Sequence, residues 1–338
     1  FNTVADSDID EDHLIPIVES FVSKDHAMKM SEHLLKIVDG DDTKDITELY
    51  EMLQEYESES TRVEDDSMFV TDDFDDIFKS VSGIGLEWRL EELNVSIGDI
   101  RKGDFVVVAA RPDTGKTSFL CSEAGYMAQQ LDDDQDVIWF NNEERGEKVK
   151  ARLWCNILNK PQHELEAMNP LDVKEEIESK LGRLDKIKIV SKPDMSVRDV
   201  ERVLSKVNAG LIIFDQLHKI QGFANSFSET DHMTKLYGWA RTVAQEYAPV
   251  INVHQAGADA SGKKYIEMHE LYASRTGIQG EADAIITIGR QLDGSTDPYT
   301  RGIYVPKNKM AGGKDPSERN GKWEVNIDPL TGRFKGAL

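Results

Sequence analysis

Residues 105–120 read FVVVAARPDTGKTSFL, and this stretch decides the fold. Residues 105–109 are an apolar run of the kind that forms a buried strand, and a helical pattern follows the Gly-Lys-Thr triplet. A buried strand that enters a helix through such a loop has the layout of a P-loop, with Ala110 in place of the usual first glycine. A chance Gly-Lys-Thr turn would lack these flanking elements. The sequence therefore predicts a phosphate-binding loop.

The residue types in this loop predict ATP and Mg²⁺ as ligands. Backbone N–H groups of the loop and of the helix N-terminus surround phosphates, and Gly115 lets the backbone approach them closely. We expect Lys116 to reach the β- and γ-phosphates and the Thr117 hydroxyl to ligate Mg²⁺. The predicted nucleotide-binding residues in the loop are Ala110, Arg111, Pro112, Asp113, Thr114, Gly115, Lys116, Thr117 and Ser118.

From residue 103 onward, short apolar runs alternate with helical patterns. The predicted strands are residues 105–110, 137–141, 187–191, 211–215, 250–254 and 284–289, and the predicted helices are residues 115–130, 145–159, 171–183, 196–208 and 229–248. This alternation predicts an α/β fold with a mainly parallel sheet and helices on both faces. Two late runs, residues 302–309 and 322–327, predict a terminal antiparallel addition.

Polar residues at three strand ends are candidates for the chemistry around the phosphates. Asp215 follows four apolar residues and is predicted to hold Mg²⁺, although a strand can also end in an ordinary surface aspartate. Glu143 and Glu144 follow another strand, and one of them is expected to position the attacking water. We favour Glu143, with a solvated capping role for Glu144 as the alternative. Gln255 ends a third strand and is predicted to sense the γ-phosphate, although a strand-end glutamine is more often structural.

Charge divides the chain into two parts. Its 338 residues carry a net charge of −23, yet residues 1–100 hold 28 acidic and 7 basic residues. We predict a short acidic helical region at residues 1–66 and an ATPase domain at residues 67–338. The short amphipathic helices of the first region need a partner surface, either in the same chain or in a neighbouring subunit. No apolar run is long enough to cross a membrane, and the first residues have neither the basic nor the apolar region of a signal peptide, so we expect a cytoplasmic protein without a membrane partner.

Several of these motifs together resemble the ATPase domain of DnaB-type replicative helicases, in the RecA-like P-loop superfamily. The resemblance covers about residues 80–338 and suggests a divergent, phage-encoded member. Ala109-Ala110-Arg111-Pro112 before the Gly-Lys-Thr triplet is similar to the family's phosphate loop. Asn142-Glu143 falls where the family has its catalytic glutamate, Asp215 lies in a strand similar to its Walker B strand, and Gln255 falls on its phosphate-sensing glutamine. The matching positions are Lys116, Glu143, Asp215 and Gln255.

The resemblance also implies sites that the residues alone would not suggest. Lys307 and Lys309 stand where the family has a Lys-x-Arg pair that reaches the ATP of a neighbouring subunit, so Lys309 occupies the position of an arginine finger. Loops that line a central channel would contact single-stranded DNA, although ordinary solvated loops are the alternative. The candidate DNA-binding residues are Lys263, Lys264, Arg275 and Gly277.

The resemblance implies an ATP-dependent DNA helicase that forms a ring, expected to be a hexamer, and translocates on single-stranded DNA to unwind duplex. Primase and a helicase loader are the further partners that it suggests. The alternative is a recombinase-like or regulatory ATPase of the same fold, which binds DNA or protein without unwinding. Closed rings would favour the helicase, and open filaments would favour the recombinase.

Overall fold

The computed structural model describes residues 11–40, 48–50, 52–53, 56, 73–74, 78, 84–223, 228–272, 277–292, 294, 297–310 and 313–336. Contacts divide the chain into two compact units, Phe1–Ser80 and Val81–Leu338. The predicted boundary between residues 66 and 67 lies outside the described residues and stays a prediction.

The described part of the first unit is mainly one long helix. Helix α1 (Glu11–Val38) lies within the predicted helical region and is followed by Gly40, whose φ of 84° suits a residue without a side chain. Met28 and Val38 are 72% and 79% exposed, so this unit leaves part of the helix's apolar surface uncovered. The rest of the predicted helical region, residues 41–66, lies largely outside the described residues.

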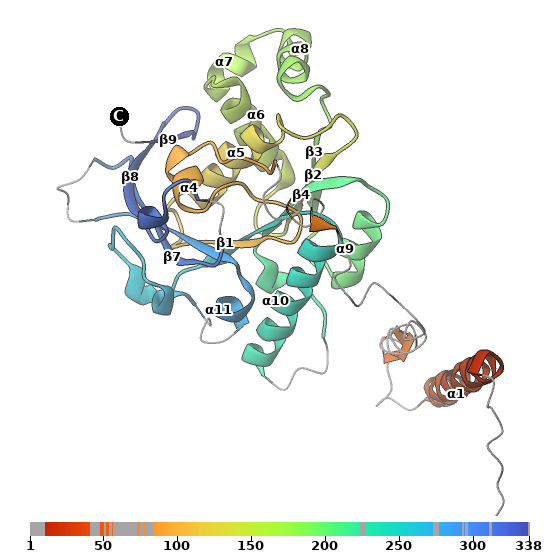
Figure 1. Ribbon diagram of the computed structural model, residues 1–338. Helices are drawn as coiled ribbons and strands as arrows, with labels where there is room; N and C mark the ends of the chain where they lie inside the picture. Colours follow the sequence, from red (N-terminus) through yellow and green to blue (C-terminus); the bar gives the residue numbers. More distant parts are fainter. Residues whose placement is uncertain are drawn as a thin grey trace, which may run out of the picture. The chain divides into compact units, whose positions relative to one another are not determined.

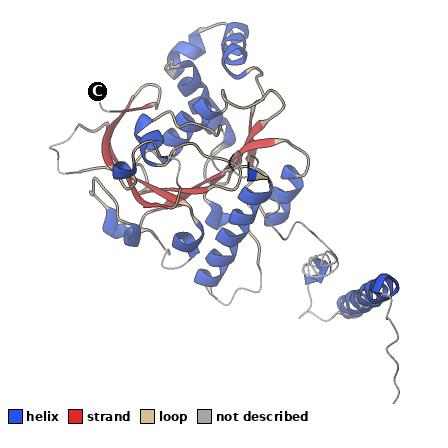
Figure 2. Ribbon diagram, viewed as in Figure 1, coloured by secondary structure: helices blue, strands red, loops and turns tan. Residues whose placement is uncertain are grey.

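The second unit is built on one nine-stranded sheet, drawn in red in Figure 2, with the strand order β3-β2-β4-β5-β1-β6-β7-β8-β9. Six strands are mutually parallel, and they are β1 (Phe105–Ala110), β2 (Asp136–Asn141), β3 (Ile187–Ser191), β4 (Ala209–Asp215), β5 (Val250–Gln255) and β6 (Ala284–Gly289). Three antiparallel strands extend one edge, namely β7 (Thr300–Asn308), β8 (Lys322–Ile327) and β9 (Phe334–Gly336).

Helices cover both faces of this sheet (Figure 1). One layer contains α5 (Lys116–Met127), α6 (Gly146–Leu158), α7 (Gln162–Ala167) and α8 (Pro170–Leu181). The other contains α9 (Val197–Leu204), α10 (Glu229–Glu246) and α11 (Gly277–Glu281). Strand β1 shows why two cores form, because Val106 and Val108 pack into the first layer while Phe105 and Val107 pack into the second.

The predicted parallel strands, long helices and antiparallel addition are confirmed to within a few residues at each end. Helix α4 (Glu91–Ser96), α7, α11 and strand β9 were not expected. Each has six residues or fewer, which is too short to show a hydrophobic period in the sequence. Short 3₁₀ turns at residues 217–219, 258–260, 268–270 and 316–318 were likewise not expected.

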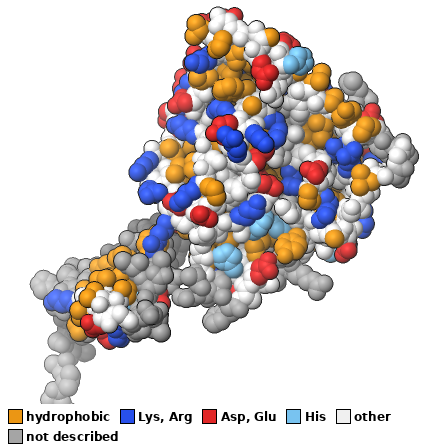
Figure 3. Space-filling view, turned by 180° about the vertical axis from the view of Figure 1, so that it is seen from behind, with side chains coloured by type: hydrophobic (Ala, Val, Ile, Leu, Met, Phe, Trp, Pro, Cys, Tyr) orange, Lys and Arg blue, Asp and Glu red, His pale blue; other side chains and the backbone are white. Residues whose placement is uncertain are grey.

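The surface of the second unit carries both signs of charge. On the face in Figure 3, basic and acidic side chains are interspersed, which agrees with the near balance of charge after residue 100. Among the described residues, no helix is both long and apolar enough to cross a membrane.

Strand register brings the predicted site residues to one edge of the sheet. Ala110 at the end of β1 lies opposite Gln255 at the end of β5. Asp215 at the end of β4 lies opposite Asn141 at the end of β2, and also pairs with Val253 of β5. The carboxyl ends of these four strands therefore meet, which is where open α/β sheets bind ligands.

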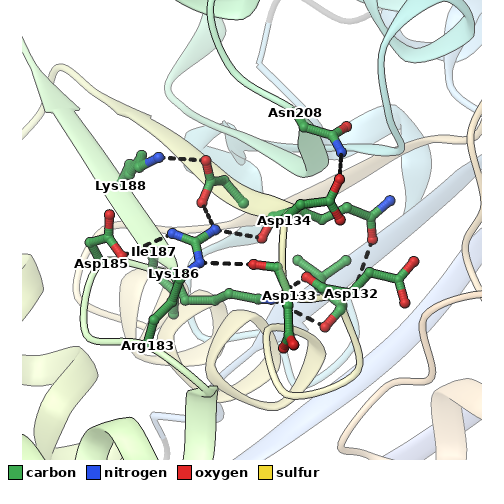
Figure 4. Close-up of polar contacts among 12 residues, drawn as sticks. Asp132, Asp133, Asp134, Arg183, Asp185, Lys186, Ile187, Lys188 and Asn208 are labelled. Atoms are coloured by element: carbon green, nitrogen blue, oxygen red, sulfur yellow. Dashed lines mark hydrogen bonds and ion pairs between the residues drawn. The ribbon is translucent and has the colours of Figure 1, made fainter.

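A buried ion-pair network connects the amino ends of β2 and β3, away from the carboxyl ends that carry the predicted site residues. Asp136, the first residue of β2, is 3% exposed and pairs with Lys188 at 2.5 Å and with Arg183. Figure 4 shows Arg183 and Lys188 beside the acidic turn that precedes β2, where Lys186 donates to the backbone of Leu131 and Asp132. Two cations compensate this buried carboxylate, so we assign it a structural role.

Asp136→Asn is expected to destabilise the domain by about 3 kcal/mol, because it leaves two cations beside a neutral amide. Denaturant unfolding of both proteins would measure the loss. An unchanged midpoint would mean that the network contributes nothing to stability.

Candidate functional site

The loop between β1 and α5 is shaped to hold an anion. Asp113 and Gly115 have φ angles of 58° and 108° ahead of Lys116, where α5 begins, and such positive φ angles are typical of loops whose backbone N–H groups bind anions. A Cβ on Gly115 would lie 2.9 Å from Cδ1 of Ile327, so this position excludes larger residues through both its angle and its space.

Lys116 lies over this loop with its charge largely removed from water. Its side chain is 7% exposed, and Nζ donates to the Arg111 carbonyl oxygen at 3.2 Å. Burial lowers the pKa of Lys116, while the carboxylates of Glu143 and Asp215 act in the opposite direction. Lys116 therefore shares one electrostatic environment with both predicted acids.

Two arginines, Arg111 within the loop and Arg301 outside it, connect the loop to neighbouring backbone. Arg301 in β7 donates through Nε to the Thr114 carbonyl oxygen at 2.7 Å, and Arg111 donates to the Ala256 carbonyl oxygen at 2.9 Å. Burial and the nearby charge of Arg290 lower the pKa of Arg301 to about 10. The sequence pattern did not reveal Arg301, because it lies almost 190 residues from its partner and belongs to no motif.

Asp215 has the surroundings of a cation ligand. It is 1% exposed, and neither carboxylate oxygen has a hydrogen-bond partner among the described residues. Burial, followed by repulsion from Glu143, raises the pKa of Asp215 to about 7, with Lys116 opposing the shift. Unpaired buried oxygens suit Mg²⁺, which proteins commonly bind through one or two carboxylates together with phosphate oxygens. Asp215, with the Thr117 hydroxyl at the start of α5, therefore fits such an ion.

The two adjacent glutamates after β2 differ in their contacts. Glu144 forms a two-point ion pair with Arg152 of α6, at 2.6 and 3.4 Å. Glu143 is exposed, and within the described part of the chain it makes no hydrogen bond or ion pair. Among the described residues, Glu143 is therefore the carboxylate without a side-chain partner and Glu144 the one with a structural partner, and the role of Glu143 toward water stays a prediction.

A cavity of about 330 Å³ adjoins the loop. Residues 111–114 form one wall, and residues 260–262 form another. The lining is completed by Ile266, by Gly289, which is the last residue of β6, and by Arg290 and Leu292 after it. The sequence did not indicate this cavity, because its walls come from three segments that are far apart along the chain.

Lys307 and Lys309 lie at the amino ends of the parallel strands, whereas the phosphate loop lies at their carboxyl ends. Asn308 pairs with Ala284 at the start of β6, whereas the loop follows the end of β1. Lys307 donates to the Gln279 carbonyl oxygen, and Lys309 donates to that of Gly280 at 3.2 Å. Burial and the charge of Lys309 lower the pKa of Lys307 to about 8. Neither lysine is therefore placed to serve the loop of its own chain.

The candidate DNA-binding residues have intramolecular contacts of their own. Lys263 pairs with the buried Glu270, and Lys264 pairs with Glu324. Gly277 is buried, and a Cβ there would lie 3.0 Å from Cα of Thr234 in α10. Arg275 lies outside the described residues. DNA contact by these four residues stays a prediction.

Comparison with known families decides the assignment. The family described as DnaB-like helicase C terminal domain matches residues 85–320. The chain belongs to this family. Its mainly parallel sheet, with the phosphate loop after β1, is accordingly the RecA-like ATPase fold, as predicted.

Relatives and solved structures agree with this membership. Replicative DNA helicase DnaB of Mycoplasma genitalium is 23% identical over 249 residues, covering 69% of this chain and 52% of the relative. Replicative DNA helicase DnaC of Bacillus subtilis is 26% identical over 220 residues, covering 61% and 47%. The chain thus spans about half the length of the curated relatives it matches.

Two solved structures share the fold at 18% identity. The ATPase domain of G40P superposes with a TM-score of 0.64, covering 78% of this chain and 96% of that one. A DnaB-like replicative helicase, whose structure describes its interactions with primase, superposes with a TM-score of 0.63 and covers 94% and 78%.

Asp215→Asn is expected to stabilise the nucleotide-free protein, in contrast to Asp136→Asn. The pKa of Asp215 is about 7 in the folded protein and about 4, its ordinary value, in the unfolded chain. Its ionisation therefore lowers the free energy of unfolding as the pH rises from about 4 to about 7. The increase in the free energy of unfolding caused by Asp215→Asn should therefore be near zero at pH 4 and reach at most about 4 kcal/mol at pH 8. Denaturant unfolding across this pH range measures it, and a loss of stability at pH 8 would contradict the unpaired state of Asp215.

Proposed function

We propose that this chain is the motor part of a ring-forming replicative helicase, which hydrolyses ATP to move along single-stranded DNA and unwind duplex. The observation that carries the proposal is the meeting of Lys116, Asp215 and Glu143 at one sheet edge, beside a loop shaped for phosphate. Membership of the DnaB-like helicase family supports it.

In this proposal each residue has a separate task. The backbone of residues 110–115 and the Lys116 ammonium bind and orient the β- and γ-phosphates. Asp215 and Thr117 hold Mg²⁺, which when bound supplies positive charge against the phosphate oxygens. Glu143 orients the attacking water and accepts its proton, and Gln255 lies close enough to the loop to register loss of the γ-phosphate.

The placement of Lys307 and Lys309 supports the proposed ring. Both lysines lie at the amino ends of the parallel strands, away from the phosphate loop of their own chain. A role in hydrolysis therefore requires the loop of a neighbouring chain. Such a head-to-tail contact closes into a ring when the rotation between subunits permits it, and six subunits are our expectation. Lys309 would then supply charge without the two-point geometry of arginine.

Single-stranded DNA would be held in the centre of this ring by residues 263–277. Lys263 and Lys264 must exchange their glutamate partners for phosphates, so we expect binding to weaken steeply with salt. The same ion pairs favour the alternative, a regulatory or recombinase-like ATPase of this fold that does not unwind DNA. Residues 1–66 would dock on a neighbouring subunit, and primase and a helicase loader are further candidate partners.

Lys116→Ala should abolish ATP hydrolysis, because it removes the cation over the phosphates.

Glu143→Gln should lower the hydrolysis rate constant at least a hundredfold while ATP still binds, since the group that accepts the proton from water is lost. Steady-state ATPase assays with and without single-stranded DNA measure both effects.

Glu144→Gln is the matched control for Glu143→Gln, because it alters the neighbouring carboxylate that already pairs with Arg152. We expect it to retain most of the activity. Equal losses in the two variants would remove the distinction between the two glutamates. A wild type that hydrolyses ATP without any response to DNA would favour the regulatory alternative.

Lys309→Ala should lower hydrolysis in the assembled ring and leave ATP binding by a single chain unchanged, because the lysine serves a neighbour's site. Mixing this variant with Lys116→Ala tests the arrangement, since mixed rings contain interfaces with both an intact loop and an intact lysine. Electron microscopy with a non-hydrolysable ATP analogue reports whether rings form. Activity that does not recover on mixing in assembled rings would argue against a shared site.

A further inference from the structure

A chain of buried hydrogen bonds runs from the nucleotide side of the sheet to the segment before Arg275. The Leu217 N–H, two residues after Asp215, donates to Oδ1 of Asn252 at 3.2 Å. Nδ2 of Asn252 donates to the Tyr237 hydroxyl at 2.8 Å. That hydroxyl lies 3.0 Å from Nδ1 of His254, and Nε2 of His254 lies 2.7 Å from the Tyr272 carbonyl oxygen.

The groups at the two ends of this chain of hydrogen bonds determine which atom donates and which accepts in every bond. The Tyr272 carbonyl can only accept, so Nε2 of His254 carries a proton. Burial lowers the pKa of His254 to about 4, so the ring is neutral near pH 7 and Nδ1 must accept from Tyr237. The Leu217 N–H can only donate, which places the Asn252 oxygen toward it and the Asn252 amide hydrogens toward Tyr237.

Burial makes these bonds costly to break. Asn252 and Tyr237 are 0% exposed and His254 is 1% exposed, so water cannot replace a lost partner. The three side chains come from neighbouring elements, with Asn252 and His254 on β5 and Tyr237 on α10. A displacement at one end must therefore be followed at the other end or leave a buried polar group unpaired.

Both ends of the chain are tied to sites that the proposed function uses. At one end, Asn142, next to Glu143, donates to the Gln216 carbonyl oxygen at 3.2 Å. At the other end, the Tyr272 N–H donates to the Gln255 carbonyl oxygen at 3.1 Å, and residues 273–277 follow directly.

We propose that Asn252, Tyr237 and His254 are positioning residues that link the position of the β4 end beside Asp215 to that of the segment at Tyr272. They contact neither nucleotide nor DNA directly and act through the backbone at Leu217 and Tyr272. The link rests on the proposed function for its purpose, which is to make the hold on DNA depend on the state of ATP. Its existence can be tested without DNA.

Tyr237→Phe tests the link, because it removes one oxygen atom and keeps the ring packed against Phe105. Hydrogen–deuterium exchange of the Tyr272 amide is measured with and without a non-hydrolysable ATP analogue and Mg²⁺. In the wild type we expect the analogue to change the exchange rate at least threefold. In Tyr237→Phe we expect that change to disappear while affinity for the analogue stays within threefold.

Ser96→Ala is the matched control, because it also removes a buried hydroxyl, one that donates to the Arg319 carbonyl oxygen at 2.9 Å outside this chain of bonds. It should keep the wild-type response of the Tyr272 amide. His254→Phe provides a second variant should Tyr237→Phe not fold, and it should also lose the response.

Two results would overturn the link: a Tyr272 amide in the wild type that ignores the analogue, or a Tyr237→Phe response equal to that of the wild type. Loss of the response in Ser96→Ala as well would also overturn it, because the effect would then be general destabilisation. Failure of the proposed function is detected separately, as wild-type ATP hydrolysis that DNA does not stimulate.

Discussion

The parallel register of β1, β5, β4 and β2 is the constraint on which the rest of the structure depends. It places Ala110 beside Gln255 and Asp215 beside Asn141, so residues that are far apart in the sequence meet at the carboxyl ends of the strands. The crossover helices that parallel strands require cover both faces, and the loops at the carboxyl ends of the strands form the edge where open α/β sheets bind ligands. Fold and site are therefore set by the same pairing.

This arrangement buries charged groups at an electrostatic cost, at a position where the charges of a bound ligand would compensate them. Lys116 and Asp215 are both buried, the pKa of Asp215 is raised and that of Lys116 is lowered, and the Asp215 oxygens have no partner in the described structure. Asp136 at the other end of β2 is buried to a similar degree and is paired with two cations. The two aspartates thus differ in their partners, and the unpaired state of Asp215 supports the cation-binding role that we propose for it.

The antiparallel extension gives the sheet two further functions. The start of β7 brings Arg301 to the phosphate loop, while its end carries Lys307 to the opposite edge. One strand therefore supports the chain's own loop and, in the proposed ring, presents cations to the next subunit. The hydrogen bonds from Leu217 to Tyr272 add a connection across β5 and α10 that no single element provides.

Local sequence determined the elements that have a clear period or motif. The apolar run before Gly115-Lys116-Thr117, the strand alternation and the acids at the strand ends are readable because each depends on neighbours in the chain. Short α4 and α11 have no such period, and Arg301, the cavity beside Arg290 and the Tyr237–His254 contact depend on partners distant in sequence. Only the tertiary structure could decide which glutamate after β2 is already paired with Arg152, because that choice rests on how α6 packs against the sheet. The sequence by itself therefore determined the fold and the chemistry available at its edge, whereas side-chain packing decided which of those groups are free to act.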